Sequence, residues 1–323
     1  MPNIKLNFAC GPYDRMEALR TGAVKPEGID LDFISIKSPR EIFDRMGQKQ
    51  EFDAAEMSSS EFVVSFCRGD SPFVALPVFP SKVFRHPFMF GSVKSGVRKP
   101  KDFEGKRIGV PLYTMTAAVW LRGLLEEDFG VDLSTIRWVQ GGMDHGGTHG
   151  VERAPPKIPG VSLETNTSAR SLNDMLVAGD LDGCIGTHAP ACCASGHVTR
   201  LLPDFHEQEK DYFRRTGIHP IMHLVVIRRD VYERNPQIAK SLYRAFDAAK
   251  QHAWDELVHS GPHVSMLPFV YANVLEARET MGDDPWPYGI EGNRRTLEAL
   301  VRFMHNQRLI PFAPKLEDLF APV

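Results

Sequence analysis

The sequence lacks the patterns that mark several large classes of protein. No apolar run approaches the ~20 residues that a membrane-spanning helix needs, and there is no heptad, solenoid-length repeat or low-complexity segment. Charge of one sign is also missing, since 38 Lys and Arg stand against 41 Asp and Glu for a formal net charge of -3. Without a basic block that could release counterions from a phosphate backbone, nucleic acid is not an expected partner. Neither is a membrane.

Several sequence motifs that identify common classes of enzyme are absent as well. The chain contains no GxGxxG dinucleotide motif, no GxxxxGK[ST] phosphate loop and no GxSxG nucleophile elbow. We therefore expect no nicotinamide cofactor, no ATP and no serine triad. The 5 cysteines form no CxxC pair, and residues 1–10 show no secretory signal pattern. These absences predict reduced thiols and a cytoplasmic protein.

What remains is an ordinary globular composition, with 42% hydrophobic residues over 323 positions. At roughly 150 residues per domain, this length predicts two units. Short apolar runs alternate with amphipathic stretches, which is typical of an α/β fold whose mostly parallel sheets carry flanking helices. The expected strands are 4–10, 31–36, 54–57, 107–110, 136–139, 182–186 and 222–227, and the expected helices are 15–20, 39–47, 61–67, 116–129, 172–178, 232–257 and 294–307.

The remaining segments predict how the chain is divided. Residues 141–160 are rich in Gly and Pro and are expected to be a loop, and 204–215 is a polar connection. We expect lobe 1 to comprise 1–93 with 218–323 and lobe 2 to comprise 94–217. Since ligands bind at the carboxyl ends of strands in such folds, we expect an active-site cleft for a small molecule between the two lobes, at the carboxyl ends of both sheets.

Polar loops follow several expected strands and are candidates for binding an anion, because strand ends and helix N-termini direct backbone N–H groups outward. Each Ser or Thr in them could equally be an ordinary helix N-cap. Arg122 lies in an apolar helical stretch and either reaches the ligand or extends its stem along apolar surface. The candidate binding residues are Tyr13, Arg15, Ser58, Ser59, Tyr113, Thr114, Thr116 and Arg122.

Candidates for catalysis are one arginine and several histidines. Arg85 and His86 are flanked by apolar residues near the expected crossing between lobes, and they combine a carboxylate clamp with a titratable imidazole. The competing interpretation is a solvated loop. His188 and His223 also lie near strand ends, with a structural histidine as the alternative. The His/Asp-rich segment 142–149 lacks the helix-face spacing of metal motifs, so no metal site is predicted.

A family resemblance is carried by strings that occur in order along nearly the whole chain. They are YDR at 13–15, EMS at 56–58, RGD at 68–70, PVFPSKVFRH at 77–86, MTAAVW at 115–120, GIHPIMH at 217–223 and DPWPYGI at 284–290. This set resembles the 4,5-dihydroxyphthalate decarboxylases. KDFEGKRIGV at 101–110 and MLVAGDLD at 175–182 also resemble type 2 periplasmic-binding-protein folds. The resemblance therefore implies a two-lobed, Venus-flytrap α/β fold.

The resemblance implies a carboxy-lyase of aromatic compound catabolism and phthalate degradation. It would convert 4,5-dihydroxyphthalate to 3,4-dihydroxybenzoate (protocatechuate) and CO2 without oxidation, through protonation of the ipso carbon. No organic cofactor is implied, a divalent metal on the catechol oxygens is compatible without being required, and a homo-oligomer is expected. The implied roles are clamping by Arg85 and Arg15, proton transfer by His86, His188 or His223, carboxylate binding by Ser58, Ser59, Thr114 and Thr116, and ring contact by Tyr13 or Tyr113.

Two questions stay open at this level. Type 2 binding folds mostly serve transporters, so the alternative is a solute-binding protein of an ABC transporter for an aromatic or other small carboxylic acid. The missing signal pattern favours the enzyme. The stretch MDHGGTH at 143–149 departs from the acidic, proline-containing stretch of the family, which leaves the identity of the aromatic acid open.

Overall fold

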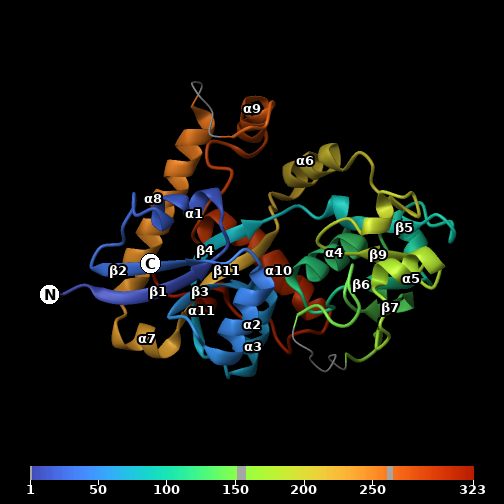
Figure 1. Ribbon diagram of the computed structural model, residues 1–323, viewed down its shortest axis with the longest axis horizontal. Coiled ribbons are helices and arrows are strands. Elements are labelled where there is room, and N and C mark those ends of the chain that lie inside the picture. The colour runs from blue at the N-terminus through green and yellow to red at the C-terminus, as the bar shows by residue number, and fades with distance from the viewer. Residues whose placement is uncertain (1, 151–157, 260–264) are drawn as a thin grey trace. The chain divides into compact units, whose positions relative to one another are not determined.

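Two compact units, each with its own sheet, make up the described part of the chain. The computed structural model describes residues 2–150, 158–259 and 265–323 (Figure 1). Unit 1 comprises Met1–Lys82, Tyr212–Glu298 and Pro314–Val323, and unit 2 comprises Val83–Asp211 and Ala299–Ala313. Unit 2 thus begins before the boundary at 93 expected from sequence, because the strand at Met89–Ser92 pairs with strands of the second sheet.

The sheet of unit 1 has the strand order β2-β1-β3-β11-β4. β1 runs parallel to β2 and β3, whereas β11 is antiparallel to both β3 and β4, so the sheet is mixed rather than mostly parallel. β4 was not predicted from the sequence, because Pro77 and Pro80 weaken its strand signal, and its edge position tolerates both prolines. The strands are β1 (Ile4–Cys10), β2 (Ile29–Ser35), β3 (Ala54–Ser58), β4 (Phe73–Lys82) and β11 (Ile221–Arg228).

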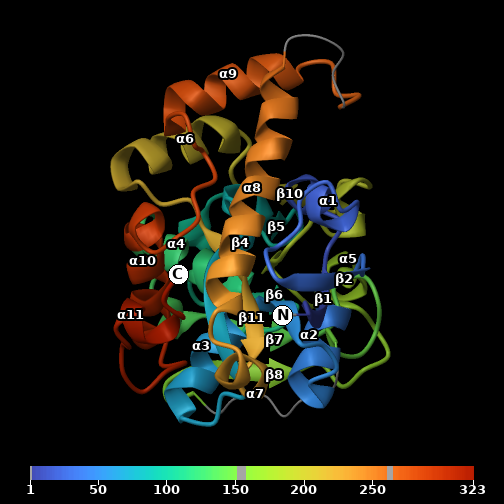
Figure 2. The same cartoon turned by 90° about the vertical axis from the view of Figure 1, so that its left-hand side faces the viewer.

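The helices of unit 1 pack on this sheet and on one another. Phe246 of α8 meets Phe8 of β1 edge-to-face at 5.1 Å, and α9 lies near the end of α8 (Figure 2). The single helix expected over 232–257 is divided, since Pro236 disfavours helical backbone in the residue before it. The helices are α1 (Asp14–Arg20), α2 (Pro39–Lys49), α3 (Ser59–Arg68), α7 (Arg229–Arg234), α8 (Ile238–Val258), α9 (Val270–Met281) and α11 (Leu316–Leu319).

The sheet of unit 2 has the order β10-β5-β9-β6-β7-β8. It too is mixed, because β9, β6, β7 and β8 are parallel neighbours while β5 is antiparallel to β9 and β10. The strands are β5 (Met89–Ser92), β6 (Arg107–Val110), β7 (Arg137–Gln140), β8 (Ser162–Thr165), β9 (Gly183–Ile185) and β10 (Val198–Arg200), and the helices include α4 (Thr116–Glu127) and α5 (Leu172–Ala178).

Two helices have residues in both units, and short 3-10 turns complete the inventory. α6 (Phe205–Thr216) forms where sequence analysis expected only a polar connection, and α10 is Arg294–Asn306. Only Tyr212 of α6 is buried, so the segment has little apolar periodicity to reveal it. The 3-10 helices are η1 (His86–Phe88), η2 (Pro100–Phe103), η3 (Leu133–Thr135), η4 (Ala191–Cys193) and η5 (Glu291–Asn293).

The core of unit 2 lies around α4 and α5. Leu172 and Leu176 of α5 pack with Cys184 and Val139 in a buried cluster. Trp120 and Gly123 of α4 meet Phe303, and a Cβ added at Gly123 would approach the Phe303 ring to 2.2 Å, so only glycine fits there. Residues 151–157 of the loop expected at 141–160 lie outside the described residues. No helix of the described chain is long and apolar enough to cross a membrane.

Candidate functional site

A fully buried carboxylate, Glu56 of β3, lies at the centre of a polar cluster in unit 1. Its Oε1 accepts a hydrogen bond from the Tyr13 hydroxyl at 2.7 Å and lies 2.6 Å from Nδ1 of His223. Its Oε2 accepts from the backbone N–H of Gly11 at 3.0 Å and from the Cys10 thiol at 3.6 Å. Through these hydrogen bonds, the Glu56 carboxylate in the middle of β3 connects the loop after β1 with the start of β11.

Sheet topology explains why these residues meet. β1 and β3 are parallel neighbours, so the loop that follows β1 and the carboxyl half of β3 share one edge. β11 runs antiparallel beside β3 with His223 opposite Ser58, which brings the first residues of β11 to that same edge. Gly11 is required for the contact, because a Cβ there would lie 2.8 Å from the Tyr13 ring.

Electrostatics keep Glu56 ionised and Tyr13 protonated. Burial by itself raises the pKa of a carboxyl, but His223, Tyr13 and the Gly11 N–H hold the pKa of Glu56 below its ordinary value. Burial and the neighbouring Glu56 carboxylate raise the pKa of Tyr13. Burial and Glu56 also raise the pKa of Cys10 well above its usual value, so this thiol is not a thiolate nucleophile.

Arg15 supplies a cation beside this carboxylate. Its guanidinium carbon lies 4.4 Å from the centre of the Tyr13 ring and 4.2 Å from that of Trp286. Nε donates to Pro80 O at 2.6 Å and Nη1 to Asp14 at 2.9 Å, whereas Nη2 has no partner among the described residues. The side chain is 16% exposed, so Nη2 is available to a carboxylate ligand.

Two further titratable groups lie against Trp286. The ammonium of Lys82 donates to Pro287 O at 3.0 Å and to Asn293 Oδ1 at 2.6 Å, and burial lowers its pKa to about 7, opposed by Asp284 and assisted by Lys250 and Arg15. His219 contacts the Trp286 ring edge-to-face at 5.4 Å. Burial and Lys82 lower the pKa of His219 to about 3, so its imidazole is neutral at neutral pH.

These residues form what we call the Glu56 cluster: Tyr13, Arg15, Glu56, Lys82, His219, His223 and Trp286. Tyr13, Arg15 and His223 were predicted from the sequence, whereas the other members were not among the predicted site residues. The missed residues all lie inside the strings that carry the family resemblance. Glu56 also offered a direct signal, since an acid within an otherwise apolar strand is rarely buried without a partner.

Ser58 and Ser59 lie next to the cluster, where β3 passes into α3. Ser58 occupies the N-cap position but makes no side-chain capping bond, and its Oγ is 3.3 Å from that of Ser60. The hydroxyl of Ser59 is buried and has no hydrogen-bond partner in the described part of the chain. The N-cap interpretation therefore does not account for these side chains.

Arg85 and His86, the first candidates for catalysis, belong to unit 2 and are both buried. The Arg85 guanidinium lies 5.4 Å from the centre of the Phe88 ring, and burial lowers its pKa to about 10. His86 begins η1 and contacts the ring of Phe84 at 6.4 Å. A solvated loop, the alternative considered from sequence, does not describe this segment.

The other candidates of unit 2 lie in different surroundings. Arg122 is 0% exposed, its Nε donates to Gln307 Oε1 at 2.9 Å, and its guanidinium stacks 3.7 Å above the Tyr113 ring. Burial lowers the pKa of Arg122 to about 10. Thr116 begins α4 and is buried, whereas Thr114 just before it is partly exposed. The Arg122 stem does not extend along exposed surface, since the whole side chain is buried, and its Nη1 and Nη2 have no hydrogen-bond partner in the described part of the chain.

His188 is the most exposed candidate, at 53% of its side chain. Its Nε2 lies 2.7 Å from Asp144 Oδ2, and its Nδ1 lies 3.1 Å from the Thr187 hydroxyl. Asp144 comes from the 143–149 stretch in which the chain departs from the family pattern. The acid of that stretch therefore pairs with one histidine.

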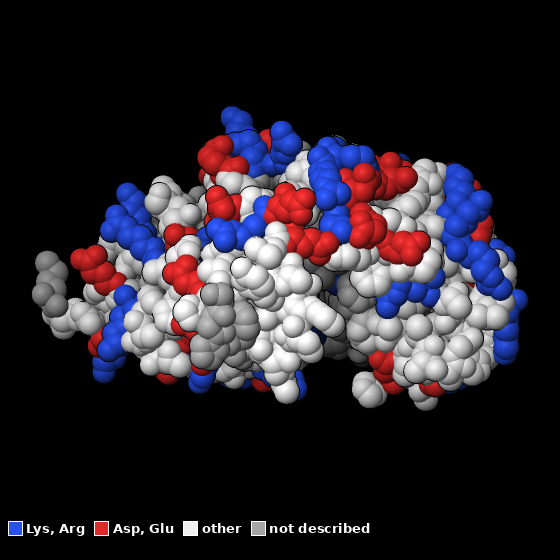
Figure 3. Space-filling view, turned by 90° about the horizontal axis from the view of Figure 1, so that it is seen from above, with Lys and Arg blue, Asp and Glu red and all other residues white. Residues whose placement is uncertain are grey.

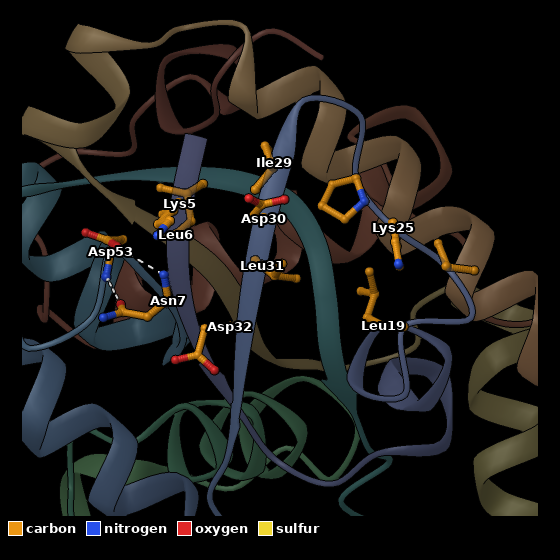
Figure 4. Close-up of a pocket in the computed structure, with 13 residues that line it drawn as sticks. Lys5, Leu6, Asn7, Leu19, Lys25, Ile29, Asp30, Leu31, Asp32 and Asp53 are labelled. Atoms are coloured by element: carbon orange, nitrogen blue, oxygen red, sulfur yellow. Dashed lines mark hydrogen bonds between the residues drawn. The ribbon is translucent and has the colours of Figure 1, made fainter. Parts of the chain in front are cut away.

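A cavity of about 640 Å³ in unit 1 lies away from the Glu56 cluster (Figure 4). It is lined by the amino-terminal halves of β1 and β2, including Lys5 and Asp32. Asn7 and Asp53 exchange hydrogen bonds of 3.0 and 2.6 Å on one side of it. The cluster lies at the carboxyl edge of β1, so this cavity is not part of it.

Comparisons with known proteins were made by sequence and by structure. A scan against protein-family models finds no match. The chain is 36% identical over 325 residues to a 4,5-dihydroxyphthalate decarboxylase of Comamonas testosteroni, an alignment that covers 100% of this chain and 98% of the relative. It is 38% identical over 217 residues to a 4,5-dihydroxyphthalate decarboxylase of Pseudomonas putida, covering 66% of this chain and 83% of that one.

The similar solved structures include periplasmic binding proteins. The aliphatic sulphonate binding protein SsuA of Escherichia coli matches with a TM-score of 0.54 and 11% identity over 99% of this chain and 98% of that chain. The sulfonate-binding protein SsuA of Methylobacillus flagellatus matches with a TM-score of 0.54 and 13% identity, over 100% of this chain and 93% of that chain. At such identities the similarity concerns the fold alone, and the predicted periplasmic-binding-protein-like α/β fold is confirmed.

Proposed function

The chain belongs to the 4,5-dihydroxyphthalate decarboxylase family of carboxy-lyases, and on that premise we propose that it converts 4,5-dihydroxyphthalate to 3,4-dihydroxybenzoate and CO2. One observation carries the catalytic part of the proposal. His223 engages Glu56 through Nδ1, and its Nε2 has no partner among the described residues. We propose this imidazole as the proton-transfer group, with Arg15, which stacks on the Tyr13 ring whose hydroxyl donates to Glu56, as the cation that binds the substrate.

The reaction is difficult because the electrons of an aryl–carboxylate bond lie in the ring plane, outside the π system. Deprotonation of the ring hydroxyl para to the leaving carboxylate places negative charge on the ipso carbon. That carbon takes a proton, becomes tetrahedral and then loses CO2, and the bonding pair returns to the ring as aromaticity is restored. The phenolate finally regains its proton, so one proton is consumed for each carboxylate released.

We propose that residues of unit 1 supply the base for the phenol and the cation for the carboxylate that stays on the ring, while the proton taken by the ipso carbon comes from a separate general acid. Nε2 of His223 takes the phenolic proton and later returns it, as a general base and acid near neutral pH. Nη2 of Arg15 binds the carboxylate that stays on the ring, and the Tyr13 and Trp286 rings on either side hold the guanidinium in place. Ser58 and Ser59 donate to carboxylate oxygens from the neighbouring turn.

The candidates of unit 2 remain predictions, and the same assay tests each of them. Arg85 and His86 are proposed for clamping and proton transfer, and His188 for proton transfer. Tyr113, Thr114, Thr116 and Arg122 are proposed for binding. Alanine variants of these residues that fold and keep full activity remove the roles.

We propose a small aromatic carboxylate as the partner, with no organic cofactor. Basic and acidic side chains are interspersed on the face seen in Figure 3, which favours a small anion over a polyanion. A divalent metal on the catechol oxygens is compatible with the mechanism without being required by it. Activity with and without a chelator decides that question.

Compartment and assembly are proposed from side-chain chemistry. All 5 cysteines are free, in accord with a reducing cytoplasm. Large apolar side chains are exposed along and just before α9, and we propose that a second copy of the chain covers them. They are Met266, Leu267, Phe269, Tyr271 and Leu275. Light scattering of the wild type and of Phe269→Ser tests the homo-oligomer, and equal monomer masses would refute it.

The function is tested by incubating the protein with 4,5-dihydroxyphthalate and following 3,4-dihydroxybenzoate by chromatography. Product formed over many turnovers supports the decarboxylase. Thermal stabilisation by aromatic acids without turnover would instead favour the solute-binding alternative. Turnover of another hydroxylated aromatic acid, and not of this one, would point to an altered specificity that accompanies the 143–149 stretch.

A further inference from the structure

We propose that Glu56 is a positioning residue, which holds His223 in the tautomer with its proton on Nδ1 and thereby makes Nε2 the atom that exchanges protons with the substrate. The proposal deepens the function proposed above and rests on it. It begins from the 2.6 Å contact between Glu56 Oε1 and His223 Nδ1. No role for Glu56 was expected from the sequence.

The tautomer follows from the chemistry of the two groups. An ionised carboxylate has only acceptors, and a neutral imidazole carries one N–H. At 2.6 Å the contact is a hydrogen bond only if Nδ1 carries that hydrogen. The other tautomer would set the Nδ1 lone pair against a carboxylate oxygen. Nε2 therefore keeps its lone pair and can accept a phenolic proton.

The carboxylate is itself fixed in place. Tyr13 donates to the same Oε1 at 2.7 Å, while Gly11 and Cys10 donate to Oε2. These donors come from the end of β1 and the turn after it, so hydrogen bonds hold both carboxylate oxygens of Glu56. Its 0% exposure also withholds the water that could otherwise replace His223.

The imidazole ring is held from a second direction. Phe43 of α2 meets it edge-to-face with the ring centres 4.9 Å apart. The side chain of His223 is nevertheless 19% exposed, and Nε2 has no hydrogen-bond partner in the part of the chain that the structure describes. A purely structural ion pair does not require an accessible second nitrogen, whereas a proton-transfer group does.

The decisive variant is Glu56→Gln, which keeps the shape of the side chain but adds an amide donor. When that amide faces Nδ1, the imidazole proton moves to Nε2 and the base is lost. We expect kcat to fall by about 100-fold or more, the usual size of a lost general base, with KM within about threefold of the wild type. Nitrogen-15 NMR reads the tautomer directly, once the His223 signals are assigned by their loss in His223→Ala.

At a pH where His223 is neutral, the wild type is expected to show a protonated Nδ1 and an unprotonated Nε2, and Glu56→Gln the reverse. The matched control is Asp53→Asn, just before the start of the same strand, where the carboxylate accepts a hydrogen bond from the backbone N–H of Asn7. That variant is expected to keep both the wild-type tautomer and kcat. Glu56→Asp retains the charge and is expected to recover part of the lost kcat.

Each outcome bears on the proposal. A wild-type His223 protonated on Nε2 overturns it, and so does a folded Glu56→Gln that keeps the wild-type kcat. If Glu56→Gln fails to fold, the wild-type tautomer and Glu56→Asp still decide the matter. If the wild type does not turn over 4,5-dihydroxyphthalate, the proposed function fails, whereas the NMR result on Glu56 and His223 stands by itself.

Discussion

The two units treat their polar residues differently. In unit 1, Tyr13 and His223 come from distant parts of the chain and meet on one buried carboxylate. In unit 2, Arg122 is packed over Tyr113 in the interior, whereas His188 is exposed and paired with Asp144. The same kind of sequence signal, a polar residue after an apolar strand, thus led to one connected site and to several separate environments.

One arginine from each unit, Arg15 and Arg122, illustrates this difference between the units. Arg15 and Arg122 both stack on tyrosine rings, at 4.4 and 3.7 Å. Arg15 keeps 16% of its side chain exposed, but Arg122 has no exposed surface at all. The two arginines therefore share the stacking contact and differ in their access to solvent.

The largest difference between the two units is expected when the imidazole of His223 in unit 1 is removed. We expect His223→Ala to lower kcat by roughly 1,000-fold, within the usual range for loss of a general base. His252→Ala, at an exposed position on α8 of the same unit, is expected to leave kcat unchanged. Steady-state kinetics on both variants checks this. A larger loss in His188→Ala would move the proton-transfer role to unit 2.

The arginine comparison predicts a different kinetic signature. Arg15→Met is expected to lower kcat/KM by about 10- to 100-fold, mostly through KM, because a charge-assisted bond to the substrate carboxylate is lost. Arg122→Met removes a fully buried side chain and its hydrogen bond to Gln307, so it is expected to lower stability as well. Arg45→Met on the exposed side of α2 is the matched control. An unchanged KM in folded Arg15→Met would remove the clamp from the proposed mechanism.

Alanine substitutions at two glycines are expected to affect stability and catalysis to different degrees. Gly123→Ala drives a Cβ into the Phe303 ring of unit 2, and we expect it to lower the free energy of unfolding by about 1–3 kcal/mol. Gly11→Ala displaces the Tyr13 ring in unit 1 and should cost kcat more than stability. Denaturant titration and steady-state kinetics on both variants test the distinction. Equal losses of stability would contradict it.

The lowered pKa of Lys82 predicts that the stability of the folded protein depends on pH. The folded protein holds its pKa at about 7, against an ordinary 10.5, so between these values the unfolded chain binds more protons and stability from this group rises with pH. Relative to Lys82→Met, the wild type should gain about 2 kcal/mol from pH 7 to pH 9. Denaturant titrations at both pH values measure the gain, and Lys240→Met, exposed on α8, should show none. If the difference in free energy of unfolding between the wild type and Lys82→Met is the same at both pH values, the Lys82 ammonium is solvated in the folded protein.

Local patterns predicted several elements well. Residues 4–10, 107–110 and 172–178 have the bounds expected from sequence, because their apolar runs or helical periodicity end at clear breaks. β4 was not predicted because of its prolines, and Lys82 at its end was not among the predicted site residues. The error propagated from the strand to the site.

The sequence by itself determined the family and the class of fold, because the strings around residues 13, 56, 85, 219 and 286 and the alternation of strands and helices are local features. Only the tertiary structure decided that Glu56 is the hub of the cluster. That contact joins residues 167 positions apart in the chain, and it exists because β11 inserts antiparallel between β3 and β4. Whether a polar side chain faces a ligand or the core depends on such non-local packing, which no local pattern encodes.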